Sequence, residues 1–140
     1  MNTGLFITFE GIDGAGKSTQ LDYAVNYLRS QKKEVVQTRE PGGTIFSEKL
    51  RSMILEAKTP LDSDTEELLM FAARKEHITR VIQPALNSGS IVVCDRFTDA
   101  TFAYQGGGSR VPPSRIETLE AWVQGNYDPS KDPHFGKPVL

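Results

Sequence analysis

The sequence lacks the means to form an internal disulfide bond, because Cys94 is the only cysteine among its 140 residues. It also lacks an apolar run close to the roughly 20 residues that a membrane-spanning helix requires. The N-terminal residues show no basic region followed by an apolar core, which is the pattern of a secretory signal. We therefore expect a cytoplasmic protein in a reducing compartment, with no membrane partner.

Neither sign of charge is in large excess. The chain has 16 Lys and Arg residues against 18 Asp and Glu residues, for a formal net charge of −2. Proteins that bind the nucleic-acid backbone usually carry a basic excess, so we expect no nucleic-acid partner. The hydrophobic content of 38% is typical of a soluble globular protein, and the length predicts a single domain.

The hydrophobic pattern alternates between buried strands and amphipathic helices. Apolar runs predict strands at residues 5–10, 33–38 and 90–95. Helical spacing predicts helices at residues 17–31, 45–56, 64–88 and 113–125, with a bend near Pro84 and an N-cap at Asp62 or Ser63. Strands that are apolar throughout and alternate with helices imply a parallel sheet covered on both faces, which is an α/β fold.

The segment "GIDGAGKS" at residues 11–18 matches the phosphate-loop pattern G-x-x-x-x-G-K-[ST] in full. Glycines let backbone N–H groups surround an anion, and the positive end of the following helix faces the same point. Lys17 would add a charge for the β- and γ-phosphates of ATP, and Ser18 would offer a hydroxyl to Mg²⁺. A glycine-rich turn without a ligand is the alternative, but the flanking strand and helix favour nucleotide binding.

We predict a cofactor site for ATP and Mg²⁺ around this loop. The residues expected to contact ATP are Gly11, Ile12, Asp13, Gly14, Ala15, Gly16, Lys17, Ser18 and Thr19. Asp95 ends the predicted strand 90–95, and an acid in that place can hold Mg²⁺ through water, with Ser18 as the second metal-binding residue. A turn or capping aspartate is the alternative for Asp95.

Three arginines suggest a second anion site. Arg96 follows Asp95, Arg39 opens a proline–glycine loop, and Arg74 lies on an otherwise apolar helix face. A guanidinium binds phosphate bidentately, and α/β folds bind ligands at the carboxyl edge of the sheet. Each arginine alone could equally be solvated or ion-paired. Phe71, one helical turn before Arg74, could stack on a nucleobase or pack in the core.

The chain resembles the thymidylate kinases of the bacterial type in five segments that occur in the same order: "FEGIDGAGKST", "REPGGT", "FAARKEH", "DRF" and "TFAYQGGG". The resemblance covers about residues 5–126, and "REPGGT" with "AYQGGG" is far more specific than the phosphate loop. It implies a P-loop NTPase-type fold of three α/β/α layers around a parallel sheet. It also implies transfer of the γ-phosphoryl group of ATP to dTMP, giving dTDP and ADP.

The resemblance further implies roles for individual residues in binding dTMP. Phe71 would stack on thymine, and Arg74 would hold the base or the phosphate side of the nucleotide. Thr101 and Gln105 would hydrogen-bond the base, which selects thymine over cytosine. Tyr104 would crowd the 2′ position of the sugar and so disfavour ribonucleotides.

The resemblance also implies which groups lie closest to the transferred phosphate. Arg39 and Arg96 would hold the acceptor phosphate, and Asp13 would approach the 3′-hydroxyl and the metal region. Lys17, Arg96 and Asp13 are therefore the predicted catalytic residues. An acceptor phosphate oxygen is already anionic near neutral pH, so catalysis reduces to aligning two anions and neutralising the charge between them.

The sequence departs from the family pattern in two places. Gly14 stands where some members carry an arginine, and bacterial-type members supply that arginine from a lid later in the chain. The family continues with a lid and further strands, so we expect a C-terminally incomplete fold with a core at residues 1–126 and an irregular tail at 127–140. Such a chain is expected to retain most of the dTMP pocket with greatly reduced turnover. Family members are commonly homodimers, which implies a homodimer through the helices predicted at 45–56 and 64–88.

Two other functions remain open at this point. A deoxynucleoside kinase shares the loop and a DR-type motif, but it phosphorylates a neutral hydroxyl and needs a carboxylate base at the acceptor site rather than "REPGGT". A nucleotide-binding module without turnover is the second alternative. Thymidine compared with dTMP as substrate separates the two kinases, and binding without product would indicate the module.

Overall fold

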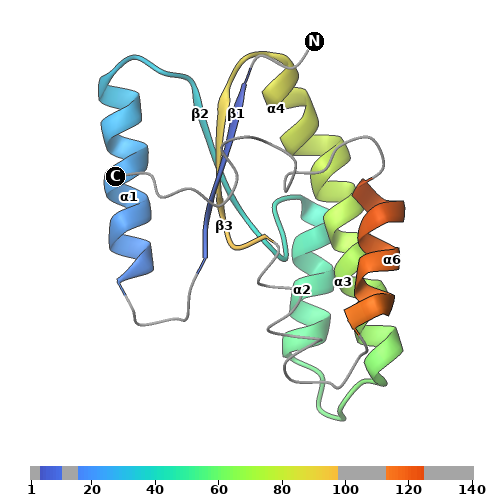
Figure 1. The fold of residues 1–140 in the computed structure, drawn as a ribbon. Helices are drawn as coiled ribbons and strands as arrows, with labels where there is room; N and C mark the ends of the chain where they lie inside the picture. The colour runs from blue at the N-terminus through green and yellow to red at the C-terminus, as the bar shows by residue number, and fades with distance from the viewer. Residues whose placement is uncertain (1–3, 11–15, 98–112, 125–140) are drawn as a thin grey trace.

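The computed structural model describes residues 4–10, 16–97 and 113–124. The elements in chain order are β1 (Leu5–Phe9), α1 (Lys17–Ser30), β2 (Val35–Arg39), α2 (Ile45–Leu55), α3 (Ser63–His77), η1 (Ile78–Ile82), α4 (Gln83–Asn87), β3 (Ile91–Asp95) and α6 (Pro113–Gln124) (Figure 1). Each predicted strand and helix is present, with ends that agree within two residues. The α/β fold class is therefore confirmed.

The three strands form a parallel sheet in the order β1-β3-β2. β3 lies in the centre, so residues far apart in sequence become neighbours across it. Asp95, the last residue of β3, lies opposite Phe9 on β1 and opposite Arg39 on β2. All three carboxyl ends consequently meet at one edge, where α/β folds bind their ligands.

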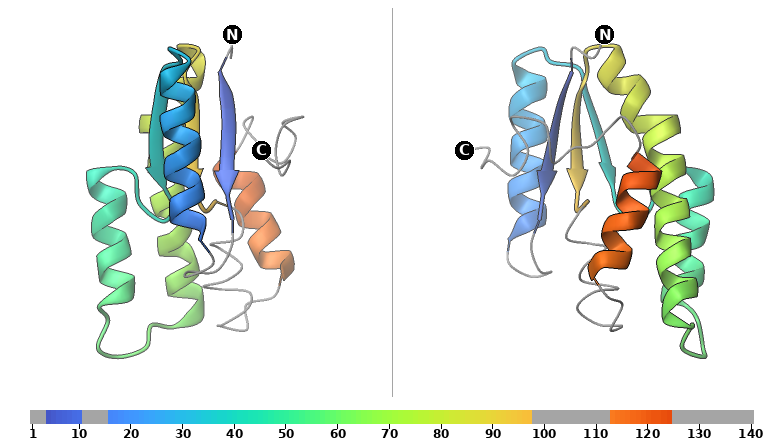
Figure 2. Two further views of the ribbon diagram at one scale, coloured as in Figure 1. Left: turned by 90° about the vertical axis from the view of Figure 1, so that its left-hand side faces the viewer. Right: turned by 45° about the vertical axis from the view of Figure 1, so that its right-hand side comes forward.

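Helices cover both faces of this sheet. On one face, Ile7 and Val93 pack against Leu21 and Val25 of α1. On the other face, the aromatic ring of Phe6 and the side chains of Val92 and Cys94 pack against η1 and α4. Figure 2 shows the resulting three layers, with α1 on one side and the long α3–η1–α4 path on the other. Side chains alternate between the two faces along each strand, which explains why the strands read as continuous apolar runs.

The helix predicted over residues 64–88 is present but changes type along its length. A π-helical turn, η1, separates α3 from α4, and the Gln83 N–H donates to the Ile78 carbonyl five residues earlier. Pro84 has no N–H, and in a regular α-helix its ring would press on the carbonyl of Arg80. The wider turn therefore falls where the proline disrupts the α-helical hydrogen bonds.

The loop between β2 and α2, residues 40–44, is held close to α3. Arg39 is the last residue of β2, whereas the sequence pattern placed it as the first residue of the loop. Gly43 has φ +92°, and a Cβ there would overlap the ring of His77. The side chain of Thr44 then caps α2 by accepting the N–H of Ser47 at 2.9 Å.

Candidate active site

The phosphate-loop lysine faces the acid at the end of β3. Gly16 has φ +82° and precedes α1, so Lys17 occupies the first turn of that helix. Lys17 Nζ lies 2.8 Å from Asp95 Oδ1, and the lysine is only 8% exposed while Asp95 is one-third exposed. The structure thus brings together two residues that the sequence assigned separately to the triphosphate and to the metal.

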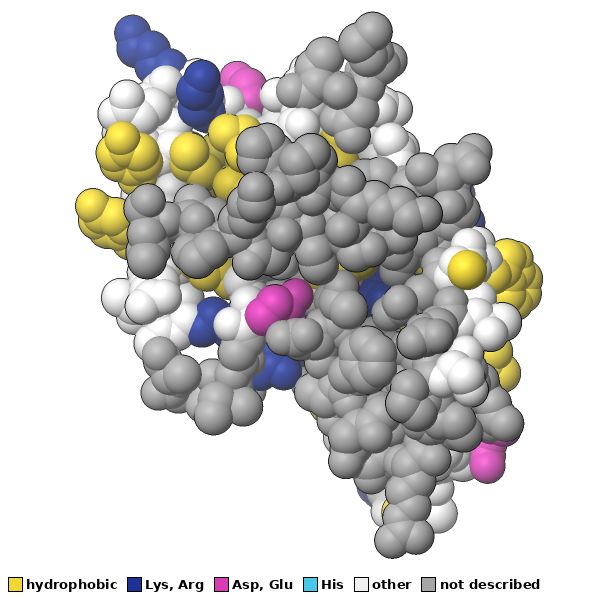
Figure 3. Space-filling view, in the orientation of Figure 1, with side chains coloured by type: hydrophobic (Ala, Val, Ile, Leu, Met, Phe, Trp, Pro, Cys, Tyr) yellow, Lys and Arg dark blue, Asp and Glu magenta, His cyan; other side chains and the backbone are white. Residues whose placement is uncertain are grey.

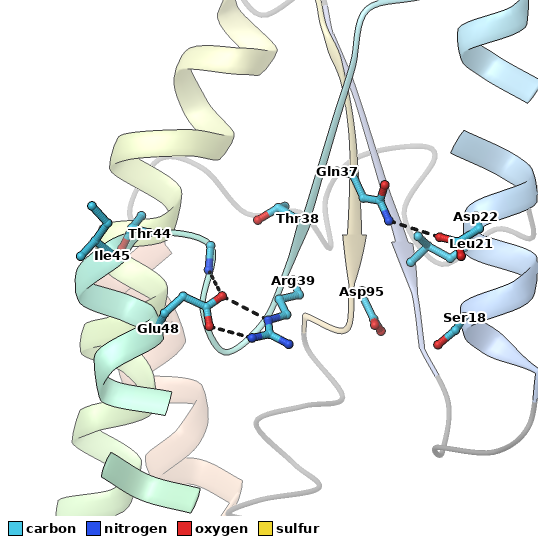
Figure 4. A pocket seen from close by; sticks show the side chains of 11 residues that line it. Ser18, Leu21, Asp22, Gln37, Thr38, Arg39, Thr44, Ile45, Glu48 and Asp95 are labelled. Carbon is cyan, nitrogen blue, oxygen red and sulfur yellow. Dashed lines mark hydrogen bonds and ion pairs between the residues drawn. The ribbon is translucent and has the colours of Figure 1, made fainter. Parts of the chain in front are cut away.

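A cleft of about 860 Å³ opens at the carboxyl edge of the sheet (Figure 4). It lies between α1 on one side and the β2–α2 loop on the other. Its lining residues are Ser18, Leu21, Asp22, Gln37, Thr38, Arg39, Gly43, Thr44, Ile45, Glu48 and Asp95. Of the residues that the sequence predicted for nucleotide, metal or acceptor phosphate, Ser18, Asp95 and Arg39 therefore share one cavity.

Arg39 enters this cleft in a bidentate ion pair with Glu48 of α2. Arg39 Nε donates to Oε1 at 3.1 Å and Nη2 donates to Oε2 at 2.8 Å. The hydrogen bonds from Arg39 lower the pKa of the Glu48 carboxyl, and the N–H of Gly43 lowers it further. Glu48, with Asp95 at longer range, raises the pKa of Arg39 in return. Both side chains are therefore charged throughout the neutral range.

A buried network of hydrogen bonds and ion pairs lies next to the β2–α2 loop. Glu40, 4% exposed, accepts from Arg74 Nε at 2.8 Å through Oε1 and from His77 Nδ1 through Oε2. A 2.6 Å hydrogen bond joins the other ring nitrogen of His77 to Thr38 Oγ1. Arg74 Nη2 also donates to the Phe97 carbonyl just after β3. This network links β2, α3 and the end of β3, and so determines where the "REPGGT" loop lies.

Phe71 and Arg74 lie on the same side of α3, as their spacing predicts. The Arg74 guanidinium lies 5.3 Å from the centroid of the Phe71 ring and 4.3 Å from that of Phe97. Phe71 is 2% exposed and packs against Val123 and Leu119 of α6. In this structure both residues are inside the protein, with Arg74 ion-paired to Glu40. Their assignment to dTMP stays a prediction.

Arg96 follows β3 in an unusual backbone conformation. Its φ of +65° lies in the left-handed region, which L-residues with side chains rarely adopt. Its N–H donates to the Phe9 carbonyl at 2.9 Å and so ties the ends of β3 and β1 together. The predicted acceptor-phosphate residue is therefore at the ligand-binding edge.

Several predicted site residues lie outside the described part of the chain. These are Gly11, Ile12, Asp13, Gly14 and Ala15 of the phosphate loop, and Thr101, Tyr104 and Gln105 of the "TFAYQGGG" segment. Their assigned roles stay predictions, as does the division into a core at 1–126 and a tail at 127–140.

Comparison with known proteins decides between the families that share this architecture. The family model for thymidylate kinase matches residues 9–130. The chain belongs to the thymidylate kinase family. Thymidylate kinases of Nitrosomonas eutropha and Burkholderia ambifaria are 54% and 57% identical to it, over 99% and 92% of the chain. A crystal structure of the thymidylate kinase from Ehrlichia chaffeensis superposes with a TM-score of 0.79 at 46% identity, covering 86% of this chain and 68% of that one.

The chain spans only part of these family members. It covers 65% of the Nitrosomonas eutropha enzyme and 64% of the Burkholderia ambifaria enzyme. The match to the P-loop fold of the thymidylate kinases confirms the fold that the five segments implied. Among the helices within residues 17–97 and 113–124, none combines the length and hydropathy needed to cross a bilayer.

Oxygen ligands for a divalent metal are available in the cleft. The Ser18 hydroxyl and the Asp95 carboxylate both line the cleft, and hard oxygen donors of this kind suit Mg²⁺, which retains waters and phosphate oxygens. The described residues bring together no cluster of three His, Cys, Asp or Glu side chains. The Ser18 hydroxyl and the Asp95 carboxylate are the described cleft groups that fit such a metal. Burial raises the pKa of Cys94 well above its ordinary value, so its thiol is not a nucleophile.

Sequence reasoning missed four residues that shape this site: Thr38, Glu40, Glu48 and His77. Glu40 and His77 stood inside the segments "REPGGT" and "FAARKEH", but their spacing of 37 positions concealed that they touch. Glu48 is an acid in the first turn of α2, a position where acids are common without a function in ligand binding. The available signal in the sequence was the pair Gly42 and Gly43 close to Arg39, because glycines without a Cβ leave space for neighbouring side chains such as Glu48 and His77.

Proposed function

We propose that the protein transfers the γ-phosphoryl group of ATP to dTMP, giving dTDP and ADP. The observation that carries this proposal is the shared cleft, in which the donor-side residues Ser18 and Asp95 face the acceptor-side residue Arg39. Figure 4 shows these side chains projecting from α1, β3 and β2 toward the same space. Membership of the thymidylate kinase family supports dTMP as the acceptor.

In this proposal the chain's own residues align two anions. Lys17, oriented by Asp95, binds the β- and γ-phosphates of ATP at the N-terminus of α1. Arg39 and Arg96 hold the acceptor phosphate. Phe71 and Arg74, which are buried outside the cleft in this structure, are assigned to the base by the family resemblance alone. Ser18 and Asp95 would hold Mg²⁺, which would supply charge neutralisation between the phosphates. The acceptor oxygen is anionic near neutral pH, so the transfer requires no general base.

A deoxynucleoside kinase would instead need a carboxylate base close to a neutral hydroxyl. Among the described residues that line the cleft, Glu48 is the acid next to Arg39, and Arg39 lowers the pKa of its carboxyl. A carboxylate with a lowered pKa is a weak base and a poor choice for that role. This geometry favours a phosphate acceptor over a hydroxyl acceptor.

Phosphoryl transfer to dTMP and to thymidine, followed by chromatography of the nucleotide products, tests the proposal. We expect dTDP from dTMP and no dTMP from thymidine. Lys17→Met should reduce the rate at least about 100-fold, because the triphosphate loses its contact with the lysine ammonium group. The exposed Lys33 provides the matched control, and Lys33→Met should leave the rate unchanged. Phosphorylation of thymidine would contradict the proposal, and binding of dTMP without product would indicate a nucleotide-binding module.

We also propose a homodimer and a cytoplasmic location. Phe46 and Met53 on α2, and Leu68 on the neighbouring α3, are all at least half exposed. Exposed large apolar side chains on two helices that pack together favour contact with a second copy of the chain. The buried, free thiol of Cys94 supports a reducing compartment.

A further inference from the structure

We propose that Glu48 is a positioning residue for the acceptor phosphate, because it holds the guanidinium of Arg39 with one N–H edge facing the cleft. This inference rests on the proposed function, which makes Arg39 a ligand of that phosphate.

In the bidentate contact, two nitrogens of the Arg39 guanidinium bind Glu48 and the third faces the cleft. Nε and Nη2 donate to the two carboxylate oxygens of Glu48 at 3.1 and 2.8 Å. Within the described residues Nη1 donates to no group, and Figure 4 shows it on the side of the guanidinium away from Glu48. Both residues line the cavity that also contains Ser18 and Asp95. A phosphate entering the cavity would therefore meet an N–H donor whose direction is already set.

The "REPGGT" loop leaves room for the Glu48 carboxylate. Gly42 has φ +141°, and a Cβ there would lie 2.5 Å from Glu48 Oε1. The N–H of the next residue, Gly43, donates to the same oxygen at 3.3 Å. The loop backbone thus packs on one side of the carboxylate and Arg39 on the other.

The Glu48 carboxylate offsets part of the positive charge that Arg39 presents to a phosphate, so its contribution to recognition is one of orientation. The hydrogen bonds that join the two side chains lower the pKa of Glu48 and raise that of Arg39, so the pair stays ionised and close to neutral in sum. Recognition then depends on a directed N–H rather than on net positive charge. A preset donor also avoids the entropy that a free arginine side chain loses on binding.

Titration of the chain with dTMP and with thymidine, by calorimetry, tests this inference. The ratio of the two affinities isolates the contribution of the phosphate. In Glu48→Gln, we expect dTMP affinity to fall about 10-fold while thymidine affinity changes less than about 2-fold. Glu76→Gln is the matched control, since Glu76 forms an exposed ion pair with Arg80 outside the cleft, and it should leave the ratio unchanged.

Two further variants separate the positioning role from a general defect. Gly42→Ala crowds the carboxylate without changing charge and also strains the backbone at φ +141°, so it should lower the ratio in the same direction together with the stability. In an Arg39→Gln background, Glu48→Gln should have no further effect on the ratio, because the group that it positions is gone. Thermal unfolding of each variant establishes that the folded state is measured.

The possible outcomes separate the two proposals. If wild-type protein prefers dTMP to thymidine but Glu48→Gln keeps the full preference, or weakens both ligands equally, the positioning role is wrong and the proposed function stands. Tighter dTMP binding by Glu48→Gln would also overturn it, because Glu48 would then compete with phosphate for Arg39. A wild-type protein with no preference for dTMP would refute the proposed function itself, and the inference with it.

Discussion

Glu40 is an ionisable side chain that the fold removes almost wholly from water, and its two oxygens show how that is tolerated. Oε1 accepts from Arg74 and Oε2 accepts from His77, so neither oxygen of the carboxylate lacks a donor. A buried ion pair of this kind contributes little net stability, but removing one partner leaves a charge without compensation. The arrangement therefore specifies the position of the "REPGGT" loop more than it stabilises the protein.

The residue scale offers a paired prediction at two glycines with positive φ. Gly43→Ala should lower the free energy of unfolding by about 2–4 kcal/mol, because the new Cβ meets the ring of His77 and lies 2.7 Å from Thr38 Oγ1, in addition to the strain at φ +92°. Gly16→Ala meets no atom within 4 Å, so only the strain at φ +82° applies, about 1–2 kcal/mol. Urea denaturation of both variants measures the difference. Equal losses would show that contact with His77 does not constrain the loop.

At the scale of single elements, the local sequence explains where α2 and α3 begin. The side chains of Thr44 and Asp62 cap α2 and α3, and each accepts an N–H from the residue three positions later. The cap of α3 was predicted from an acid or serine before a helical pattern, and the structure selects Asp62. The π-helical turn was not predictable in type, since Pro84 indicates only that regular α-helix is disrupted. The type of turn also depends on the packing of Ile78 and Ile82 against the sheet.

Removing a cap should reduce stability by a predictable amount. In Asp62→Ala, the N–H of Thr65, now accepted at 3.1 Å, loses its partner. We expect the free energy of unfolding to fall by about 1 kcal/mol. Lys58→Ala, in the exposed loop before α3, is the control and should change it by less than about 0.5 kcal/mol. A loss below the control value would mean that water replaces the cap without penalty.

At the scale of the whole molecule, the surface is mixed in charge and carries apolar side chains at separate places. Figure 3 shows hydrophobic side chains over α1, where Tyr23 and Tyr27 are exposed, with acidic and basic groups close together nearer the centre. The exposed apolar residues of α2 lie on the other side of the sheet, as Figure 1 shows for the helices themselves. The exposed apolar residues of α1 and those of α2 can therefore be substituted independently.

The proposed homodimer gives a prediction at this scale. Phe46 and Met53 are seven residues apart, which places them on one face of α2, and both are exposed. Changing both to Glu should shift the protein from dimer to monomer in sedimentation velocity, because two charges would enter a self-complementary apolar interface. Tyr27→Glu on α1 serves as the control and should leave the dimer intact. Dissociation by the α1 variant alone would place the interface elsewhere.

The sequence by itself determined the α/β class, the order and ends of the elements, the phosphate-loop motif and the family. Those properties are encoded locally: strand and helix periodicity spans a few residues, and the diagnostic segments are each shorter than a dozen. The sequence also placed Lys17 at a helix start, Asp95 at a strand end and Arg39 directly after a strand, which nearly suffices to predict that they meet. Only the assignment of individual contacts was missing.

Tertiary structure decided which side chains touch. The central position of β3 brings Asp95 between Phe9 and Arg39, and the return of α3 along the loop joins Glu40 to Arg74 and His77. These partners are 34 or more residues apart, so no local pattern specifies them. The pairing of Arg39 with Glu48 is closer in sequence, yet it depends on backbone space at Gly42 that only the folded loop creates. Motifs therefore indicate which chemistry is present, and packing decides how each charged group is oriented for it.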